Sequence, residues 1–192
     1  MDKLNAKELR KIKGSRRVRM ELRREIYIVL DNVLDTYNIG SIFRLADAVA
    51  AKKLYLCGGT EIPPNHRIKK ASINTTEVVD WEYCESAVEA IKKVKRVQGK
   101  GEKVMVVAIE QSANSIPYSQ FDYQLPICLV VGHESEGVSK EVLDLADGVV
   151  ELPMLGINKS LNVMVSLSVV LYRITADLKL NNNLTQKSPK NL

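Results

Sequence analysis

Residues 152–164 read Leu-Pro-Met-Leu-Gly-Ile-Asn-Lys-Ser-Leu-Asn-Val-Met, and the rest of the chain is best interpreted from this stretch. The apolar run 148–152 has the composition of a strand, and Pro153 and Gly156 end that run. The free backbone of glycine allows a sharp turn, and Ser160 offers the start of a helix. Such a turn leaves backbone N–H and C=O groups available to bind a small polar ligand.

The composition is that of one α/β domain. The chain has 192 residues, of which 45% are hydrophobic, and no Pro-rich or Gly-rich linker divides it. We expect a folded domain over 25–178, a basic arm over 1–24 and a polar tail over 179–192. No run approaches the roughly 20 apolar residues of a membrane span, and no apolar signal core follows the charged N-terminus. We therefore expect a cytoplasmic protein with no membrane contact.

The three cysteines, Cys57, Cys84 and Cys128, are widely separated and lie mostly in apolar runs. This spacing argues against a disulfide framework and against a zinc knuckle. We expect three reduced thiols in the core and no bound metal.

The positive charge is concentrated at the N-terminus. Residues 1–24 contain ten Lys or Arg and three acidic residues, whereas the remaining chain has 18 basic and 20 acidic residues. A cluster of one sign at a chain end attracts phosphate backbones, so the arm is interpreted as binding a polyanion. A solvated tail is the alternative, and a membrane-surface helix has little support because its apolar face would be thin.

From residue 26 onward, short β-branched runs alternate with helical stretches. This alternation predicts a mostly parallel sheet with helices on both faces. Residues 58–76 show no regular pattern, and residues 180–192 have the composition of a frayed tail. Strands are predicted at 26–33, 53–57, 78–83, 104–109, 127–131 and 148–152, and helices at 39–50, 85–97, 140–146 and from 160 to about 178.

Residues 35–44, Asp-Thr-Tyr-Asn-Ile-Gly-Ser-Ile-Phe-Arg, lead from the first predicted strand into a helix. The carboxyl ends of parallel strands are where α/β sheets place their sites. Asn38 is a candidate cap of the helix, and Gly40 permits close backbone approach. Arg44 follows about one and a half turns later, within reach of the same strand end, where its planar fork suits a phosphate. An Arg44 that is merely solvated on the helix surface is the alternative.

Residues 131–139, Val-Gly-His-Glu-Ser-Glu-Gly-Val-Ser, again join a strand to a helix through a glycine-rich loop. Glu134 is expected to accept backbone N–H groups within this loop or to pair with Arg44, and Ser139 is expected to cap the helix. The phosphate-loop lysine and the dinucleotide glycine spacing are missing, so a nucleoside triphosphatase or a conventional Rossmann site finds no support. Both histidines of the chain are interpreted as structural or surface residues.

The chain thus contains N-x-G-x-x-x-R at 38–44, G-x-E-x-x-G at 132–137 and P-M-x-G-x-x-x-S-L-N-V at 153–163. In order and spacing these resemble the three motifs of the SpoU (TrmH-like) RNA 2′-O-ribose methyltransferases of the SPOUT superfamily, over roughly residues 25–175. The resemblance implies a C-terminal deep trefoil knot, in which the chain threads a loop and forms an S-adenosylmethionine pocket. Knots are rare among protein folds.

The resemblance also implies roles for residues. Arg44 would be the catalytic residue and would either help deprotonate a ribose 2′-hydroxyl or stabilise the developing alkoxide, since an arginine with a pKa above about 12 is a poor base in water. Asn38 would orient Arg44 or the ribose, and Glu134 would support the site. Ser160 and Asn162 would hold the knot and the substrate side. The methyl donor would contact backbone at Ile109, Gly132, Leu152, Met154 and Leu161.

The implied activity is methyl transfer from S-adenosylmethionine to a ribose 2′-hydroxyl of RNA. With no separate N-terminal RNA-binding domain, the chain resembles the tRNA branch, in which a D-loop guanosine is a common target, so tRNA is favoured over ribosomal RNA. Because family members pair, we expect a two-fold homodimer, with Val165, Val169 and Tyr172 of the last helix as a candidate interface. A ribosomal RNA methyltransferase and a catalytically silent knotted RNA-binding module are the alternatives.

Overall fold

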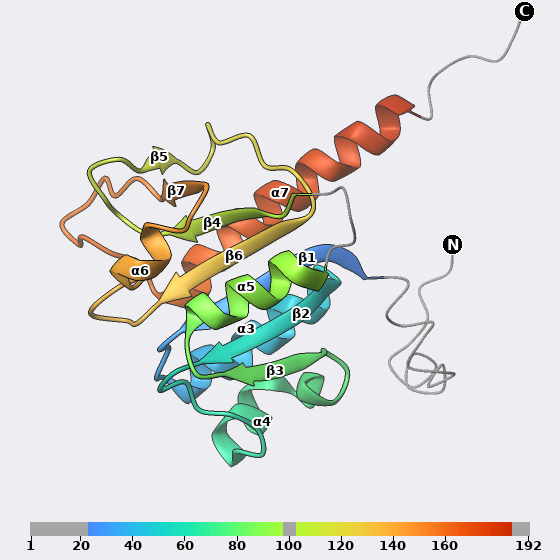
Figure 1. Cartoon of the computed structure of the whole chain (residues 1–192), viewed down its shortest axis with the longest axis vertical. Coiled ribbons are helices and arrows are strands. Elements are labelled where there is room, and N and C mark those ends of the chain that lie inside the picture. The colour runs from blue at the N-terminus through green and yellow to red at the C-terminus, as the bar shows by residue number, and fades with distance from the viewer. Residues whose placement is uncertain (1–22, 98–102, 186–192) are drawn as a thin grey trace, which may run out of the picture.

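The computed structural model describes residues 23–97 and 103–185, which form a sheet with helices on both sides (Figure 1). Every pair of neighbouring strands is parallel, which confirms the predicted parallel sheet. The strand order is β3-β2-β1-β6-β4-β7-β5. The strands are β1 (Arg24–Asp31), β2 (Ala51–Cys57), β3 (Trp81–Cys84), β4 (Met105–Ile109), β5 (Ile116–Pro117), β6 (Ile127–Gly132) and β7 (Gly148–Glu151).

Helices cover both faces of the sheet, as the alternating pattern predicts. A short 3-10 turn, η1 (Thr75–Glu77), precedes β3. One face of the sheet carries α3 (Thr36–Ala48), α4 (His66–Ser72) and α7 (Val163–Thr185), and the other carries α5 (Ala87–Val97) and α6 (Lys140–Leu143).

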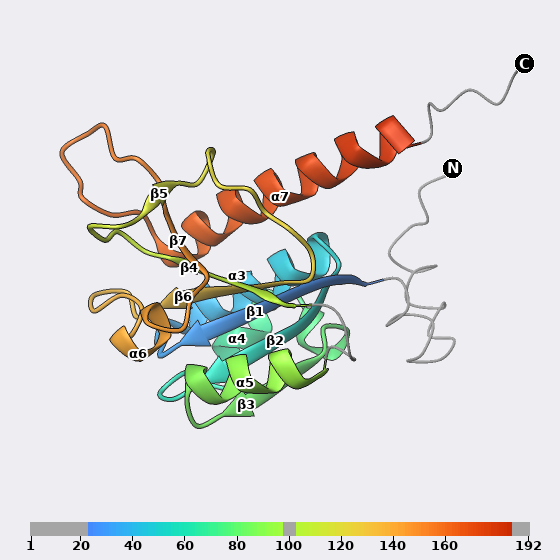
Figure 2. The same cartoon turned by 45° about the horizontal axis from the view of Figure 1, so that its top comes forward.

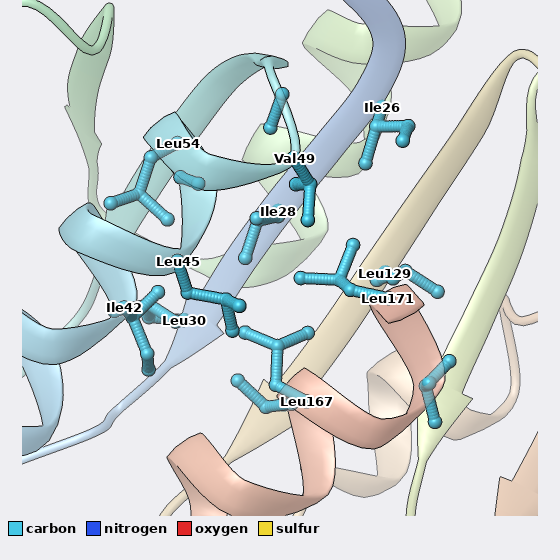
Figure 3. Close-up of a cluster of buried hydrophobic side chains, with 14 of the residues drawn as sticks. Ile26, Ile28, Leu30, Ile42, Leu45, Val49, Leu54, Leu129, Leu167 and Leu171 are labelled. Atoms are coloured by element: carbon cyan, nitrogen blue, oxygen red, sulfur yellow. The ribbon is translucent and has the colours of Figure 1, made fainter. Parts of the chain in front are cut away.

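The packing of β1 explains its uninterrupted apolar sequence. Ile26, Ile28 and Leu30 are fully buried on the side of α3 and α7, where they meet the buried leucines of α7 (Figure 3). Tyr27 and Val29 are buried on the opposite side, in the cluster that includes α5. A parallel strand that is dry on both faces must be apolar at nearly every position.

The three cysteines are buried and free, as predicted. Burial raises the pKa of the Cys128 thiol to about 12, so this thiol is protonated at neutral pH. No helix in the described part of the chain has the length and apolar content that a membrane span requires. Within residues 23–97 and 103–185, no group of three or more His, Cys, Asp or Glu side chains is placed to hold a metal ion.

Helix α3 begins three residues earlier than predicted. The carboxylate of Asp35 accepts the backbone N–H of Tyr37 at 2.7 Å and that of Asn38 at 3.4 Å, so Asp35 is the cap. The prediction that Asn38 caps this helix is wrong. Asn38 instead lies in the first turn, with its side chain buried and free to make other contacts.

Helix α4 lies within residues 58–76, for which the sequence predicts no regular structure. Gly40 allows α3 to approach this helix closely, because a Cβ at Gly40 would lie 2.6 Å from the Cβ of Ala71 and 2.7 Å from the carbonyl oxygen of Ile68. The predicted close approach at Gly40 is therefore confirmed.

Helix α7 differs from the prediction at both ends. It begins at Val163 instead of Ser160, because the side-chain oxygen of Asn162 caps it by accepting the N–H of Met164 at 3.0 Å. It continues to Thr185, so residues 180–185 are helical where a frayed tail is predicted. Neither Gly nor Pro occurs over 163–185 to stop the helix. Residues 186–192 lie outside the described part.

The segment between β5 and β6 passes over α7 in both views of the molecule (Figures 1 and 2). Tyr118, Phe121, Tyr123 and Leu125 from this segment pack against the cluster that contains the buried residues of α7. A chain segment that crosses the C-terminal helix is what the predicted knot requires. The knot itself stays a prediction.

The first described residue already belongs to the fold. The guanidinium of Arg23 donates to the carbonyl oxygens of Ala51 and Val78, at 2.9 Å each, and lies 3.0 Å from the carboxylate of Asp47. Residues 1–22, which hold most of the predicted basic arm, lie outside the described part.

Candidate functional site

A cavity of about 380 Å³ opens where β4, β6 and β7 end. We call it the main cavity. All five residues predicted to contact a cofactor line it, and so do Glu134, Ser160 and Asn162. The five come from the ends of β4 and β6 and from the segment after β7, namely Ile109, Gly132, Leu152, Met154 and Leu161. Their binding role stays a prediction.

A chain of hydrogen bonds connects the three motifs at the edge of this cavity. The side-chain N–H of Asn38 donates to the Glu134 carboxylate at 3.1 Å. The side-chain N–H of Asn162 donates to the side-chain oxygen of Asn38 at 2.9 Å. Asn162 in turn caps α7, so the first helix, the glycine-rich loop and the last helix are held together by three side chains.

Glu134 has a different environment from the one predicted. Its carboxylate accepts the backbone N–H groups of Leu34 and Asp35, each at 3.1 Å, so it binds the β1–α3 turn, which the sequence did not predict. It forms no ion pair with Arg44. Partial burial raises the pKa of Glu134, but the hydrogen bonds from Leu34, Asn38 and Asp35 outweigh it, and the net direction is downward.

The loop after β6 is folded back on itself. The backbones of His133 and Gly137 exchange two hydrogen bonds, at 3.0 and 2.9 Å. The Nδ1 atom of His133 accepts the N–H groups of Ser135 and Glu136, at 3.1 and 3.2 Å, so His133 has the predicted structural role. A Cβ at Gly132 would lie 2.2 Å from the Gly137 carbonyl, so this position accepts glycine alone without a backbone shift.

Ser139 occupies the predicted cap position of α6, but its side chain forms no capping hydrogen bond. Its backbone N–H donates instead to the buried carboxylate of Asp31 at 2.9 Å. This bond attaches the loop to the end of β1.

Glu110 is a site residue that the sequence interpretation missed. Its carboxylate accepts the N–H of Gln111 and that of Val138, each at 2.8 Å, and it lines the main cavity. Gln111 donates to the carbonyl of Lys159 at 2.7 Å, which attaches the end of β4 to the stretch 152–164. The signal was present, because Glu110 follows a buried strand directly, at the carboxyl end where sites form.

The stretch 152–164 runs along the main cavity but leaves its tip in solvent. Leu155 and Ile157 are 98% and 100% exposed. No atom lies within 4 Å of a Cβ placed at Gly156, and its φ is not among the positive values found at Gly58 and Gly137. The chain bends at residues 156 and 157, but neither contacts nor backbone conformation require glycine at position 156.

The comparisons with known proteins agree with this geometry. The family described as the SpoU rRNA methylase family matches residues 25–172. The chain belongs to this family.

Similar proteins include tRNA-modifying and rRNA-modifying members of the SpoU family. A tRNA (guanosine(18)-2′-O)-methyltransferase of Aquifex aeolicus is 31% identical over 166 residues, covering 85% of this chain and 74% of that enzyme. The crystal structure of the A. aeolicus TrmH/SpoU tRNA modifying enzyme has a TM-score of 0.74 at 28% identity, covering 89% of this chain and 85% of that one. An AdoMet-bound rRNA methyltransferase from Sinorhizobium meliloti has a TM-score of 0.71 at 27% identity, covering 83% and 60%.

Arg44 is the one predicted site residue of this SpoU-family chain that lies apart. It is exposed, does not line the main cavity, and has no hydrogen-bond or ion-pair partner among the described residues. At about 100° per residue, it lies roughly 120° around α3 from Asn38 but nearly in line with Tyr37. Tyr37 and Arg44 therefore share one exposed face of α3.

A second hollow of about 740 Å³ adjoins the main cavity, and we call it the side groove. Two residues, His133 and Glu134, line both. The remaining lining residues come from the β1–α3 turn, from the start of α3 and from the segment around α4, and they are Leu34, Asp35, Thr36, Tyr37, Glu61 and Arg67.

Proposed function

We propose that the protein transfers a methyl group from S-adenosylmethionine to a ribose 2′-hydroxyl of RNA, and that the target is a guanosine in the D-loop of a tRNA. The observation that carries the proposal is the Glu134–Asn38–Asn162 chain, which joins the three family motifs beside one cavity. The A. aeolicus relative, a tRNA (guanosine(18)-2′-O)-methyltransferase, supports the choice of tRNA and of guanosine.

The main cavity suits an adenosine-containing methyl donor. Its volume lies in the range of small-molecule sites, about 300–1,000 Å³. Ile109, Leu152, Met154 and Leu161 supply apolar surface for a purine. Gly132 lines the same cavity, and its missing side chain lets the backbone of Gly137 pack closely against it. When bound, S-adenosylmethionine supplies an electrophilic methyl group. Ser160 and Asn162 line the same cavity, and in this proposal they hold its substrate side.

In this proposal Arg44 is the catalytic residue and acts on the ribose. Its guanidinium either removes the proton of the 2′-hydroxyl, together with an RNA phosphate, or stabilises the developing alkoxide. The second role requires no change in the protonation state of Arg44. Asn38 and Glu134 are positioning residues, because their side chains bind each other and the β1–α3 turn. They fix the start of the helix that carries Arg44.

The location of Arg44 supports a homodimer. Because its guanidinium lies outside the main cavity of its own chain, it is available to an RNA held between two copies. Val165 and Tyr172 of α7 are 37% and 57% exposed and supply apolar surface for pairing, as does the tip at Leu155 and Ile157. We propose a two-fold dimer with this surface at its centre, in the cytoplasm.

The basic surface of α4 extends the proposed RNA-binding region. His66, Arg67, Lys69 and Lys70 are all exposed on this short helix, and the helix contains no acidic residue. Together with the arm, His66, Lys69 and Lys70 offer phosphate contacts that a tRNA-binding protein requires.

A ribosomal RNA target is the second candidate, favoured by the S. meliloti rRNA methyltransferase. One experiment separates the candidates. The purified protein is incubated with S-adenosylmethionine carrying a labelled methyl group and with tRNA or ribosomal RNA from cells that lack it, and ribose-methylated nucleosides are mapped by mass spectrometry. Label in a D-loop guanosine of tRNA is expected. Label in ribosomal RNA alone favours the second candidate, and RNA binding without label indicates a silent module.

A further inference from the structure

The side groove is placed to hold the part of the RNA next to the reacting ribose. It shares the wall formed by His133 and Glu134 with the main cavity, so a ligand that fills both passes directly from one to the other. Its remaining residues come from the β1–α3 turn, from the start of α3 and from the segment around α4. The inference below rests on the proposed function.

Two opposite charges in this groove have no protein partner. Glu61 and Arg67 are exposed, and neither side chain forms a hydrogen bond or an ion pair within the described residues. Some charged side chains elsewhere on the surface do form pairs, as Lys140 does with Asp144 at 2.6 Å. The carboxylate and the guanidinium of the groove are therefore both free to bind a ligand.

An aromatic ring completes the groove. Tyr37 is 52% exposed, although its backbone is fixed, because its N–H donates to the capping carboxylate of Asp35 at 2.7 Å. A partly exposed ring on a fixed backbone is a platform on which an unstacked base can lie.

We propose that the side groove binds the guanine base of the methylated nucleotide. Guanine has two acceptors, O6 and N7, on one edge, and these suit an arginine. Its adjacent N1–H and N2 amino donors suit a carboxylate, and no other common base combines both pairs. Arg67 binds O6 and N7, Glu61 accepts from N1–H and the amino group, and Tyr37 lies against the face of the base. Glu61 and Arg67 are thus the residues that determine specificity.

The test compares four tRNA transcripts that differ only at the target nucleotide. This nucleotide is guanosine, inosine (which lacks the N2 amino group), 2-aminopurine riboside (which lacks O6 and, with it, the N1 proton) or adenosine. Wild-type protein should prefer guanosine by roughly 10-fold to 100-fold in kcat/KM. Glu61→Gln should reduce the guanosine-to-inosine ratio about tenfold, and Arg67→Ala should reduce the guanosine-to-2-aminopurine ratio similarly. Tyr37→Ala should raise KM for every transcript, whereas Tyr37→Phe should not.

Matched controls lie outside the groove. Lys70→Ala, on the same helix as Arg67, and Glu141→Gln, an exposed carboxylate on α6, should leave the four ratios unchanged. Binding of the same transcripts, measured by fluorescence anisotropy, gives base ratios that do not depend on turnover. A wild-type protein that binds but transfers no methyl group would contradict the proposed function, while its binding ratios would still decide the base site. Ratios that Glu61→Gln and Arg67→Ala both leave unchanged overturn the groove assignment.

Discussion

Replacing Gly132 by alanine should disrupt the loop that forms one wall of the main cavity. The added Cβ would lie 2.2 Å from the carbonyl carbon and oxygen of Gly137 and 2.3 Å from the nitrogen of Val138. All three atoms belong to the backbone, so no side-chain rotation relieves the contact. The loop has to open, and the two backbone hydrogen bonds between His133 and Gly137 are then lost.

The structure sets the size of this effect. Overpacking costs about 1–3 kcal/mol, and each lost backbone hydrogen bond costs about 1 kcal/mol. The free energy of unfolding should fall by about 3–5 kcal/mol, which is less than the stability of most domains within the typical range of about 5–15 kcal/mol. Gly156→Ala is the matched control, because nothing lies within 4 Å of its Cβ, and its change should stay within about 0.5 kcal/mol.

Urea unfolding of the two variants measures the change in stability, and titration calorimetry with S-adenosylmethionine measures the change in binding. We expect Gly132→Ala to lose both stability and binding, because the loop that it displaces lines the main cavity. We expect Gly156→Ala to retain both. A Gly132→Ala protein with wild-type stability and wild-type affinity would refute the reasoning from the loop geometry.

Three further outcomes are expected. Arg44→Ala should slow single-turnover methyl transfer by roughly 10²-fold to 10⁴-fold. The affinity for the methyl donor, measured by calorimetry, should stay nearly unchanged because Arg44 lies outside the main cavity. Full activity of this variant would contradict the catalytic role of Arg44. Glu134→Gln should lower the free energy of unfolding at neutral pH. Because the pKa of Glu134 lies below the ordinary 4.5, this difference should be complete above pH 4.5 and shrink in unfolding curves as the pH falls through the lowered value. Deleting residues 1–22 removes eight Lys or Arg and retains Arg23, which is bonded to the fold. This deletion should weaken RNA binding and reduce the dependence of the affinity on salt concentration. An unchanged salt dependence would contradict a phosphate-binding arm.

The sheet was predictable because its strands are buried on both faces. Each of the longer strands reads as an apolar run, and six of the seven were predicted near their observed positions. The missed strand β5 has two residues, too few for any pattern. Helix α4 was missed because only Ile68 and Ser72 in it are buried, so the helix shows no apolar periodicity. Its cap, Asn65, was the available signal, since its side chain accepts the N–H groups of Arg67 and Ile68.

The residues of the site could be predicted from the sequence, but the hydrogen bonds between them could not. Asn38, Glu134 and Asn162 were all identified from their motifs, yet the partners of each were not. Asn38 and Glu134 are 96 positions apart, and Asn38 and Asn162 are 124 apart. The order of the strands in the sheet decides which polar side chains come together across such separations. Local sequence propensity carries no information about that strand order. The hydrogen bonds of Glu134 to the β1–α3 turn were not predicted for this reason.

The shared wall between the two hollows has a consequence for how donor and RNA binding depend on each other. Glu134 lines both hollows and binds the turn that precedes Tyr37 and α3, while His133 lines both and fixes the glycine-rich loop. A donor that orders the loop should therefore also order the wall against which the base lies, and the two ligands should strengthen each other by the same factor. Glu134→Gln should weaken this coupling, whereas Tyr37→Ala, which touches only the side groove, should weaken RNA binding alone.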